Sequence, residues 1–207
     1  MNPPAQRPLG AVMLGGSAGS VDVLLSLLPA FDAASSVPVL VVVHVPRARP
    51  SRLVEVFGPK CRVPVVEAED KQPLLPGVIY LAPPDYHLLV DKGAQLALAA
   101  DELVHHSRPS IDVLFESAAD VFGSAVLAIV LSGANADGAA GLATIARAGG
   151  LTWVQAPADA AAPAMPEAAL AAAPDSTVLG VAEIAEELRT IRAGLYRQRP
   201  FAPRVSP

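Results

Sequence analysis

The chain has 207 residues, of which 52% are hydrophobic and 17% charged, and its formal net charge is −5. This length and hydrophobic content allow one sizeable core, so we expect a single main domain. The negative charge and the lack of a basic cluster argue against nucleic acid as a partner. Cys61 is the only cysteine, which excludes an internal disulfide and favours a cytoplasmic location.

Three segments are expected from the distribution of apolar residues. A proline-rich, disordered lead-in covers residues 1–8, one folded domain covers 9–193, and a C-terminal tail covers 194–207. No apolar run approaches the roughly 18 residues that a membrane-spanning helix needs, so we expect no membrane insertion.

Short apolar runs alternate with segments of helical periodicity along the folded domain. The runs predict strands at 9–14, 39–43, 63–66, 126–131, 151–155 and 177–181, and the periodic segments predict helices at 20–30, 51–57, 109–122, 138–148, 166–173 and 182–193. Further runs at 78–82, 87–90 and 95–98, the last two separated by an Asp-x-Gly turn, predict a small antiparallel hairpin insertion at the sheet edge. This alternation predicts an α/β fold with a doubly wound, mainly parallel sheet flanked by helices.

Local signals predict where several helices begin and end. Ser20 is a plausible N-cap for the first helix, and Pro109 suits the first position of the helix that Gly123 ends.

Three predicted strands are followed by side chains that could act together in ester hydrolysis. Ser17 follows the first strand in a glycine-rich turn, His44 follows the second, and Asp137 follows the strand at 126–131. The carboxyl ends of parallel strands share one edge of the sheet, where ligands of such folds bind. A serine can attack the carbonyl, a histidine can take and return its proton, and an aspartate can orient the imidazole.

Each of these residues also has a purely structural interpretation. Ser17 could cap the first helix, Asp137 could cap a helix starting at Gly138, and His44 could be a hydrogen-bonded interior histidine. His87 is expected to be structural or to line the cleft rim. The adjacent His105 and His106 lack metal-ligand spacing, so no metal site is predicted.

Six blocks carry a resemblance to a known family. They are LGGSAG at residues 14–19, VVVHVP at 41–46, YLAPPDYHLL at 80–89, RPSIDVLF at 108–115, LSGANADGA at 131–139 and MP at 165–166. Their order and spacing resemble those of the catalytic domain of CheB-type chemotaxis protein-glutamate methylesterases. The match covers about residues 9–192, nearly the whole chain.

The resemblance implies an activity and a set of site residues. The family removes methyl groups from glutamate methyl esters on the cytoplasmic helices of chemoreceptors, and some members also deamidate receptor glutamines. The implied triad is Ser17, His44 and Asp137, and no cofactor or metal is used. Backbone groups near Ala134 are implied as oxyanion donors, and Ala18 and Gly16 are expected to line the same cleft.

The sequence departs from the family pattern around this cleft. Ala18 replaces a threonine, Val43 a glutamine, Ala134-Asn135 a Met-Gly pair, and Ala156 an aspartate. Two alternatives therefore remain: a divergent serine esterase with another substrate, and a non-catalytic Rossmann-like interaction module. The glycine turn lacks the G-x-G-x-x-G pattern of dinucleotide sites.

The resemblance also bears on regulation. Many relatives have an N-terminal receiver domain whose phosphorylation unblocks the catalytic cleft. The first predicted strand begins near residue 9, which leaves no room for such a domain before it. We therefore expect no control by phosphorylation of this chain, and control instead through expression or a separate regulatory protein, or none.

Overall fold

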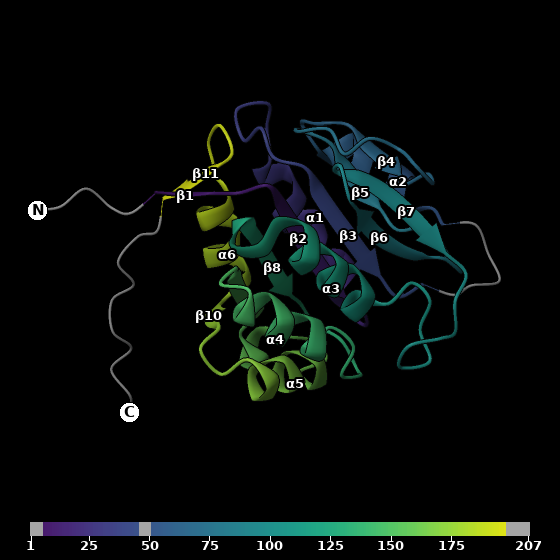
Figure 1. The fold of residues 1–207 in the computed structure, drawn as a ribbon. Coiled ribbons are helices and arrows are strands. Elements are labelled where there is room, and N and C mark those ends of the chain that lie inside the picture. Colours follow the sequence, from purple (N-terminus) through teal and green to yellow (C-terminus); the bar gives the residue numbers. More distant parts are fainter. Residues whose placement is uncertain (1–5, 46–50, 198–207) are drawn as a thin grey trace, which may run out of the picture.

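The computed structural model describes residues 6–45 and 51–197, and it confirms the predicted α/β architecture (Figure 1). Seven strands form one parallel sheet in the order β10-β9-β8-β2-β3-β5-β4. They are β2 (Ala11–Gly16), β3 (Val39–Val43), β4 (Val65–Glu67), β5 (Ile79–Leu81), β8 (Val126–Val130), β9 (Leu151–Gln155) and β10 (Thr177–Leu179). The α-helices are α1 (Ser20–Leu27), α2 (Leu53–Phe57), α3 (Ile111–Phe122), α4 (Ala139–Arg147), α5 (Ala164–Ala172) and α6 (Val181–Leu188).

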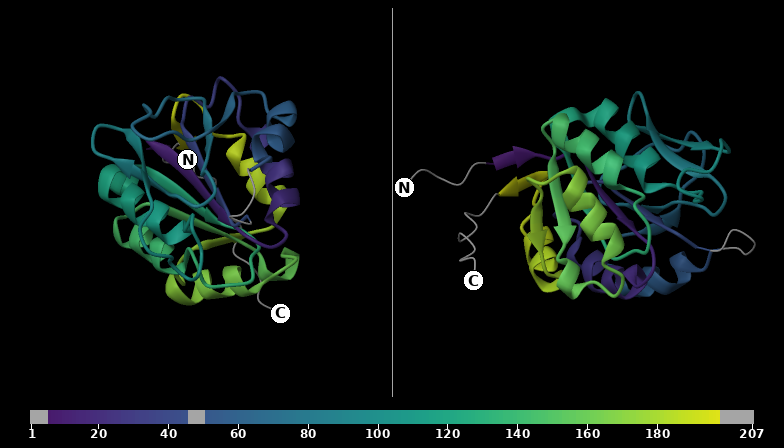
Figure 2. Two further views of the ribbon diagram at one scale, coloured as in Figure 1. Left: turned by 90° about the vertical axis from the view of Figure 1, so that its right-hand side faces the viewer. Right: turned by 90° about the horizontal axis from the view of Figure 1, so that it is seen from below.

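Helices cover both faces of this sheet, as the left view of Figure 2 shows. On one face, side chains of α1, α2 and α6, such as Leu24, Phe57 and Ile184, pack in one hydrophobic core. On the other face, α3, α4 and α5 form a second core that includes Phe115 and Leu142. Every residue of β2, β3 and β8 is buried, because these central strands have helices on both sides.

The strand order places a topological switch point between β2 and β8. From β2 the chain builds outward through β3 to β5 and β4, and it then returns to the other side of β2 to add β8, β9 and β10. In open α/β sheets, ligands bind outside the carboxyl ends of the strands at such a point. The turn after β2 and the loop after β8 therefore border the expected cleft.

The hairpin prediction is confirmed for two of its three runs. Strands β6 (His87–Asp91) and β7 (Gln95–Ala99) pair antiparallel in a separate two-stranded sheet. The run at 78–82 behaves differently, because β5 lies inside the main sheet between β3 and β4. Its three residues are all buried, as expected for an interior strand.

The predicted lead-in and tail are wrong in part. Strand β1 (Gln6–Pro8) pairs antiparallel with β11 (Leu195–Arg197), so both segments contribute ordered structure. The N–H of Leu9 also donates to the carbonyl of Gly194 at 2.7 Å. Pairing of segments so far apart in sequence leaves no local signal. The remaining parts of these predictions, residues 1–5 and 198–207, lie outside the described residues.

Two residues predicted to mark helix starts take other positions in the structure. Gly19, with φ of 78°, is the N-cap of α1, so Ser20 is the first helical residue and its hydroxyl donates to the Ser17 carbonyl at 2.7 Å. A positive φ favours glycine at this cap. Helix α3 begins at Ile111 and not at Pro109, because Ser110 is its N-cap and accepts a hydrogen bond from the N–H of Val113. The predicted end at Gly123 is confirmed.

Helices α3 and α4 approach closely at Gly141. A Cβ on this residue would lie 2.7 Å from Phe115 Cβ and 3.0 Å from both Cα and the carbonyl oxygen of Asp112. Two of these contacts are backbone, so Gly141→Ala must push the helices apart. We expect a loss of about 1–3 kcal/mol in the free energy of unfolding, measured by denaturant titration.

Gly58 provides a matched control for this substitution. No atom lies within 4 Å of the position where its Cβ would stand, and its φ of −51° suits any residue. Gly58→Ala should leave the free energy of unfolding unchanged or raise it by about 0.4–1 kcal/mol. Equal stability of the two variants would contradict the close approach at Gly141.

Candidate active site

Ser17 directly follows β2, and His44 directly follows the neighbouring strand β3. Its N–H donates to the Ser132 carbonyl at 2.9 Å, and the N–H of His44 donates to the Gly16 carbonyl at 3.2 Å. Ser132 also donates its hydroxyl to the Ala18 carbonyl at 2.7 Å. These bonds fix the serine turn between the ends of β3 and β8, and they leave Ser17 half-buried.

The His44 ring is bonded to the buried carboxylate of Asp137. Nε2 of His44 lies 2.8 Å from Oδ2 of Asp137, and the two side chains are 12% and 0% exposed. Since the carboxylate accepts, Nε2 carries the proton and Nδ1 is left as the basic nitrogen. Nδ1 is 3.5 Å from the hydroxyl of Ser107, and no hydrogen bond joins it to Ser17 in this structure.

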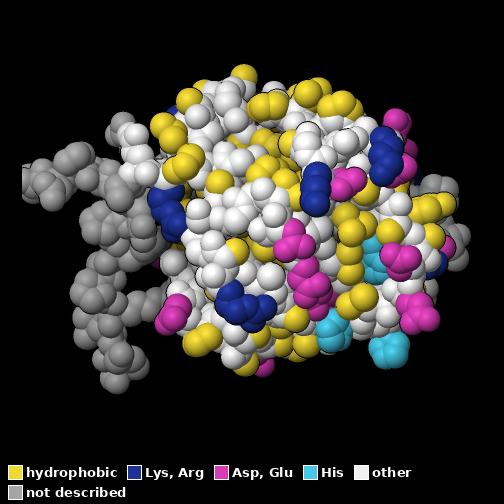
Figure 3. Space-filling model, viewed as in Figure 1, with side chains coloured by type: hydrophobic (Ala, Val, Ile, Leu, Met, Phe, Trp, Pro, Cys, Tyr) yellow, Lys and Arg dark blue, Asp and Glu magenta, His cyan; other side chains and the backbone are white. Residues whose placement is uncertain are grey.

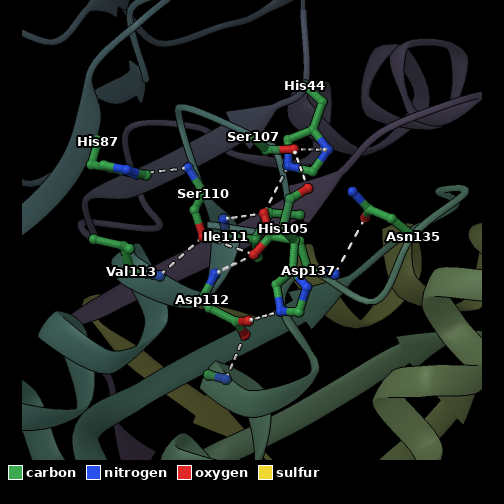
Figure 4. Close-up of polar contacts among 11 residues, drawn as sticks. His44, His87, His105, Ser107, Ser110, Ile111, Asp112, Val113, Asn135 and Asp137 are labelled. Atoms are coloured by element: carbon green, nitrogen blue, oxygen red, sulfur yellow. Dashed lines mark hydrogen bonds and ion pairs between the residues drawn. The ribbon is translucent and has the colours of Figure 1, made fainter. Parts of the chain in front are cut away.

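Asp137 receives three further hydrogen bonds from the start of α3 (Figure 4). The N–H of Ile111 donates to Oδ2 at 2.8 Å, the N–H of Asp112 donates to Oδ1 at 3.0 Å, and the Ser110 hydroxyl donates to Oδ1 at 2.8 Å. Asp137 therefore caps α3 and not α4, whose own N-cap residue Gly138 supplies no side-chain hydrogen bond. The structural interpretation of Asp137 as a cap for the helix starting at Gly138 is therefore wrong, because the helix that it caps is α3.

These bonds keep the carboxyl group ionised. Burial alone would raise the pKa of Asp137, but the hydrogen bonds from His44, the Ile111 and Asp112 amides and the Ser110 hydroxyl lower it below its ordinary value. The start of a helix also favours a negative charge. An ionised Asp137 can hold the imidazole in one tautomer and stabilise the imidazolium.

This lowered pKa predicts a pH-dependent effect of Ser110→Ala. A carboxyl with a depressed folded-state pKa stabilises the fold above its unfolded pKa of about 3.9, and that stability is lost as the pH falls through the folded pKa. Removing the Ser110 hydroxyl should cost about 1.5–3 kcal/mol near neutral pH. In thermal melts, the Tm difference from wild type should shrink as the pH falls below about 4, because Asp137 then becomes protonated in both variants. A difference independent of pH would contradict the assignment.

A second set of serine, histidine and aspartate contacts is structural. The buried His87 accepts from the N–H of Ser110 at Nδ1, 3.1 Å away, and its Nε2 lies 3.0 Å from the Glu102 carbonyl. Because Ser110 is 0% exposed and its hydroxyl is committed to Asp137, it cannot reach a substrate. The expectation that His87 is structural agrees with these contacts.

Asp112 caps the start of α4, as Asp137 caps the start of α3. Its Oδ1 accepts from the N–H of Gly141 at 2.7 Å, and its Oδ2 lies 3.3 Å from Nε2 of the half-exposed His105. Burial raises the pKa of Asp112, aided by the negative charge of Asp137 and opposed by the Gly141 amide and His105. The two aspartates thus form a reciprocal pair of caps that fixes α3 to α4 beside His44.

The predicted oxyanion and cleft residues differ in exposure. Ala18 and Ala134 are exposed, and across residues 6–45 and 51–197 their backbone N–H groups find no acceptor. Gly16 is buried in β2, and a Cβ there would lie 2.5 Å from Ser20 Cβ. Gly16 therefore allows close packing under the serine turn rather than lining the cleft surface.

Histidine and acidic side chains lie together on the lower right of the face shown in Figure 3. Over the described part of the chain, however, no group of His, Cys, Asp and Glu side chains is arranged to hold a metal ion.

None of the helices in the described ranges has the length and hydrophobicity that a membrane span requires.

A family model described as CheB methylesterase matches residues 12–188. The chain belongs to the CheB methylesterase family. This finding confirms the resemblance seen in the six sequence blocks, and it agrees with the arrangement of His44 and Asp137 at the carboxyl edge of the sheet.

Individual CheB relatives extend this comparison. A Leptospira interrogans relative is 37% identical over 176 residues, which cover 85% of this chain and 91% of that protein. A Nocardioides protein-glutamate methylesterase/protein-glutamine glutaminase is 37% identical over 206 residues, covering 97% of this chain but 55% of its own length. The crystal structure of the Thermotoga maritima CheB methylesterase catalytic domain superposes with a TM-score of 0.82 at 26% identity, covering 87% of this chain and 97% of that one.

Sequence reasoning missed several residues that build this CheB-family site. Ser110 bonds to the carboxylate of Asp137, a contact that was not predicted from the sequence. The contacts of Ser107, Asp112 and Ser132 were not predicted at all. Ser-x-Asp directly after a proline signals a helix start, yet no local pattern says which distant carboxylate that start will bind.

Proposed function

We propose that this chain is a protein-glutamate methylesterase in which Ser17 is the nucleophile, His44 the general base and Asp137 the orienting carboxylate. The observation that supports this most directly is the 2.8 Å bond between His44 and a buried, ionised Asp137, beside a serine at the switch point of the sheet. Ser17 is the hydroxyl in the glycine turn, and it is partly accessible.

The proposed reaction has two stages. The Ser17 Oγ attacks the ester carbonyl carbon while Nδ1 of His44 takes the hydroxyl proton, and the carbonyl oxygen becomes an oxyanion. Collapse of this intermediate breaks the bond to the methoxy group, which leaves as methanol with the proton from His44. Water, activated by the same nitrogen, then hydrolyses the acyl-serine to a glutamate carboxylate and free Ser17.

Base catalysis through Nδ1 requires a rearrangement from the structure described here. Nδ1 faces the Ser107 hydroxyl at 3.5 Å, which is at the limit of a hydrogen bond. In our proposal Ser17 takes this position when substrate binds, since catalytic bonds are often long before the Michaelis complex forms. Asp137 does not move, because four donors hold it.

The substrate we propose is a methylated glutamate on the cytoplasmic helices of a chemoreceptor. This proposal is supported by family membership and by the names of relatives such as the Nocardioides protein. The same attack on a glutamine side-chain amide would release ammonia, which corresponds to the glutaminase part of that name. Control by a separate regulatory protein and a cytoplasmic location remain predictions.

Methanol release from a radiolabelled, methylated receptor fragment tests this function. Wild-type protein should release methanol in proportion to enzyme concentration and time, and Ser17→Ala should not. A fragment with glutamate in place of methylated glutamate serves as the blank. Hydrolysis of small esters without release from the receptor fragment would support the divergent esterase instead.

A further inference from the structure

Asn135 lies in the loop between β8 and α4, two residues before Asp137. Its Oδ1 accepts a hydrogen bond from the N–H of Asp137 at 3.2 Å, which fixes the orientation of the side-chain amide. Since the oxygen faces Asp137, the Nδ2 group points the other way. Figure 4 shows this nitrogen on the side of Asn135 that faces His44. Within the described residues Nδ2 has no acceptor, and Asn135 is half-buried.

An oxyanion formed at Ser17 needs hydrogen-bond donors that the fold has not already used. The N–H of Ser17 itself is committed to the Ser132 carbonyl at 2.9 Å. Around the turn and the β8 loop, the backbone N–H groups that have no acceptor within the described residues include those of Ala18 and Ala134, whose side chains add no polar group. The amide of Asn135 is adjacent to Ala134 and supplies two N–H donors.

We infer that the side-chain amide of Asn135 is a catalytic group that donates a hydrogen bond to the oxyanion formed when Ser17 attacks its substrate. This inference rests on the proposed function. The bond from Asp137 holds the amide in place before substrate binds, so its dipole needs no reorganisation during the reaction. One loop then carries both the orienting carboxylate and the oxyanion donor.

Asn135→Ser tests this role. A serine hydroxyl can still accept from the N–H of residue 137, as side chains in such turns do, but it removes the two amide donors. We expect kcat to fall on the order of 10²-fold, with KM and Tm close to wild type, because the lost bond forms only in the transition state. Ala136→Ser, at an exposed position in the same loop, is the matched control and should leave kcat unchanged.

A second measurement separates this inference from the proposed function. An alkyl phosphonofluoridate should phosphonylate Ser17 with loss of fluoride, and its phosphoryl oxygen needs the same donors. Intact-mass kinetics should show slower labelling of Asn135→Ser, whatever the natural substrate. If wild type is labelled but releases no methanol from the receptor fragment, the proposed function fails and the labelling rates still decide the role of Asn135. The inference about Asn135 would be overturned by equal labelling rates of wild type and Asn135→Ser, by an unchanged kcat of Asn135→Ser, or by no labelling of wild type.

Discussion

Replacing Ser17 with alanine is expected to lower kcat for methyl ester hydrolysis by on the order of 10³ or more. Without the nucleophile, only the residual catalysis of the oxyanion donors and of binding is left. The fold should be unaffected, because Ser17 is tied to its neighbours through its N–H and carbonyl, which alanine keeps. Stopped-time methanol assays and thermal melts on the same preparation measure both quantities.

Ser107 provides the matched control for this variant. The Ser107 hydroxyl is 3.5 Å from His44 Nδ1. Ser107→Ala should retain far more activity than Ser17→Ala. If Ser107→Ala were instead the inactive variant and Ser17→Ala nearly wild type, the nucleophile would be on the 104–107 turn and our triad would be wrong.

Asp137→Asn is expected to damage activity and stability together. An amide nitrogen in place of Oδ2 would face donors from His44 and Ile111, and in place of Oδ1 it would face donors from Ser110 and Asp112. In the first orientation the imidazole must change tautomer, which lowers kcat by about 10⁴-fold in serine triads. In either orientation a buried donor loses its acceptor, at a cost of about 1–3 kcal/mol.

Asp112→Asn separates the two effects. Asp112 caps α4 and is 4% exposed, but its carboxylate does not touch His44. An asparagine oxygen can still accept from Gly141, so we expect a modest change in Tm and a kcat within about tenfold of wild type. Comparable losses of kcat in Asp112→Asn and Asp137→Asn would mean that Asp137 acts only as a cap.

The central strands were the most predictable part of this fold. The run at 39–43 became β3 without any change of bounds, and β2 and β8 differ from their predictions by one or two residues. Buried parallel strands are apolar throughout, so their sequence alone distinguishes them from their surroundings. Because Ser17, His44 and Asp137 each come after one of these strands, their placement at one edge of the sheet could be predicted with them.

The helix ends and the supports of the site could not be predicted in the same way. Ser20 and Pro109 have the right chemistry for helix starts, but the left-handed Gly19 and the buried Ser110 took those positions. The partner of Asp137 was assigned to its own helix because local capping is the commoner pattern. Its true partners on α3 lie 25–27 residues away, a separation that local patterns do not report.

The reciprocal caps offer a spectroscopic view of the site. The amide protons of Ile111 and Asp112 bond to the carboxylate of Asp137, and that of Gly141 bonds to Asp112. Their NMR chemical shifts therefore sense the charge on each aspartate directly, with no substrate present. In an acid titration, the Ile111 and Asp112 amide signals report the ionisation of Asp137, the carboxylate that orients His44. The Gly141 signal reports the ionisation of Asp112.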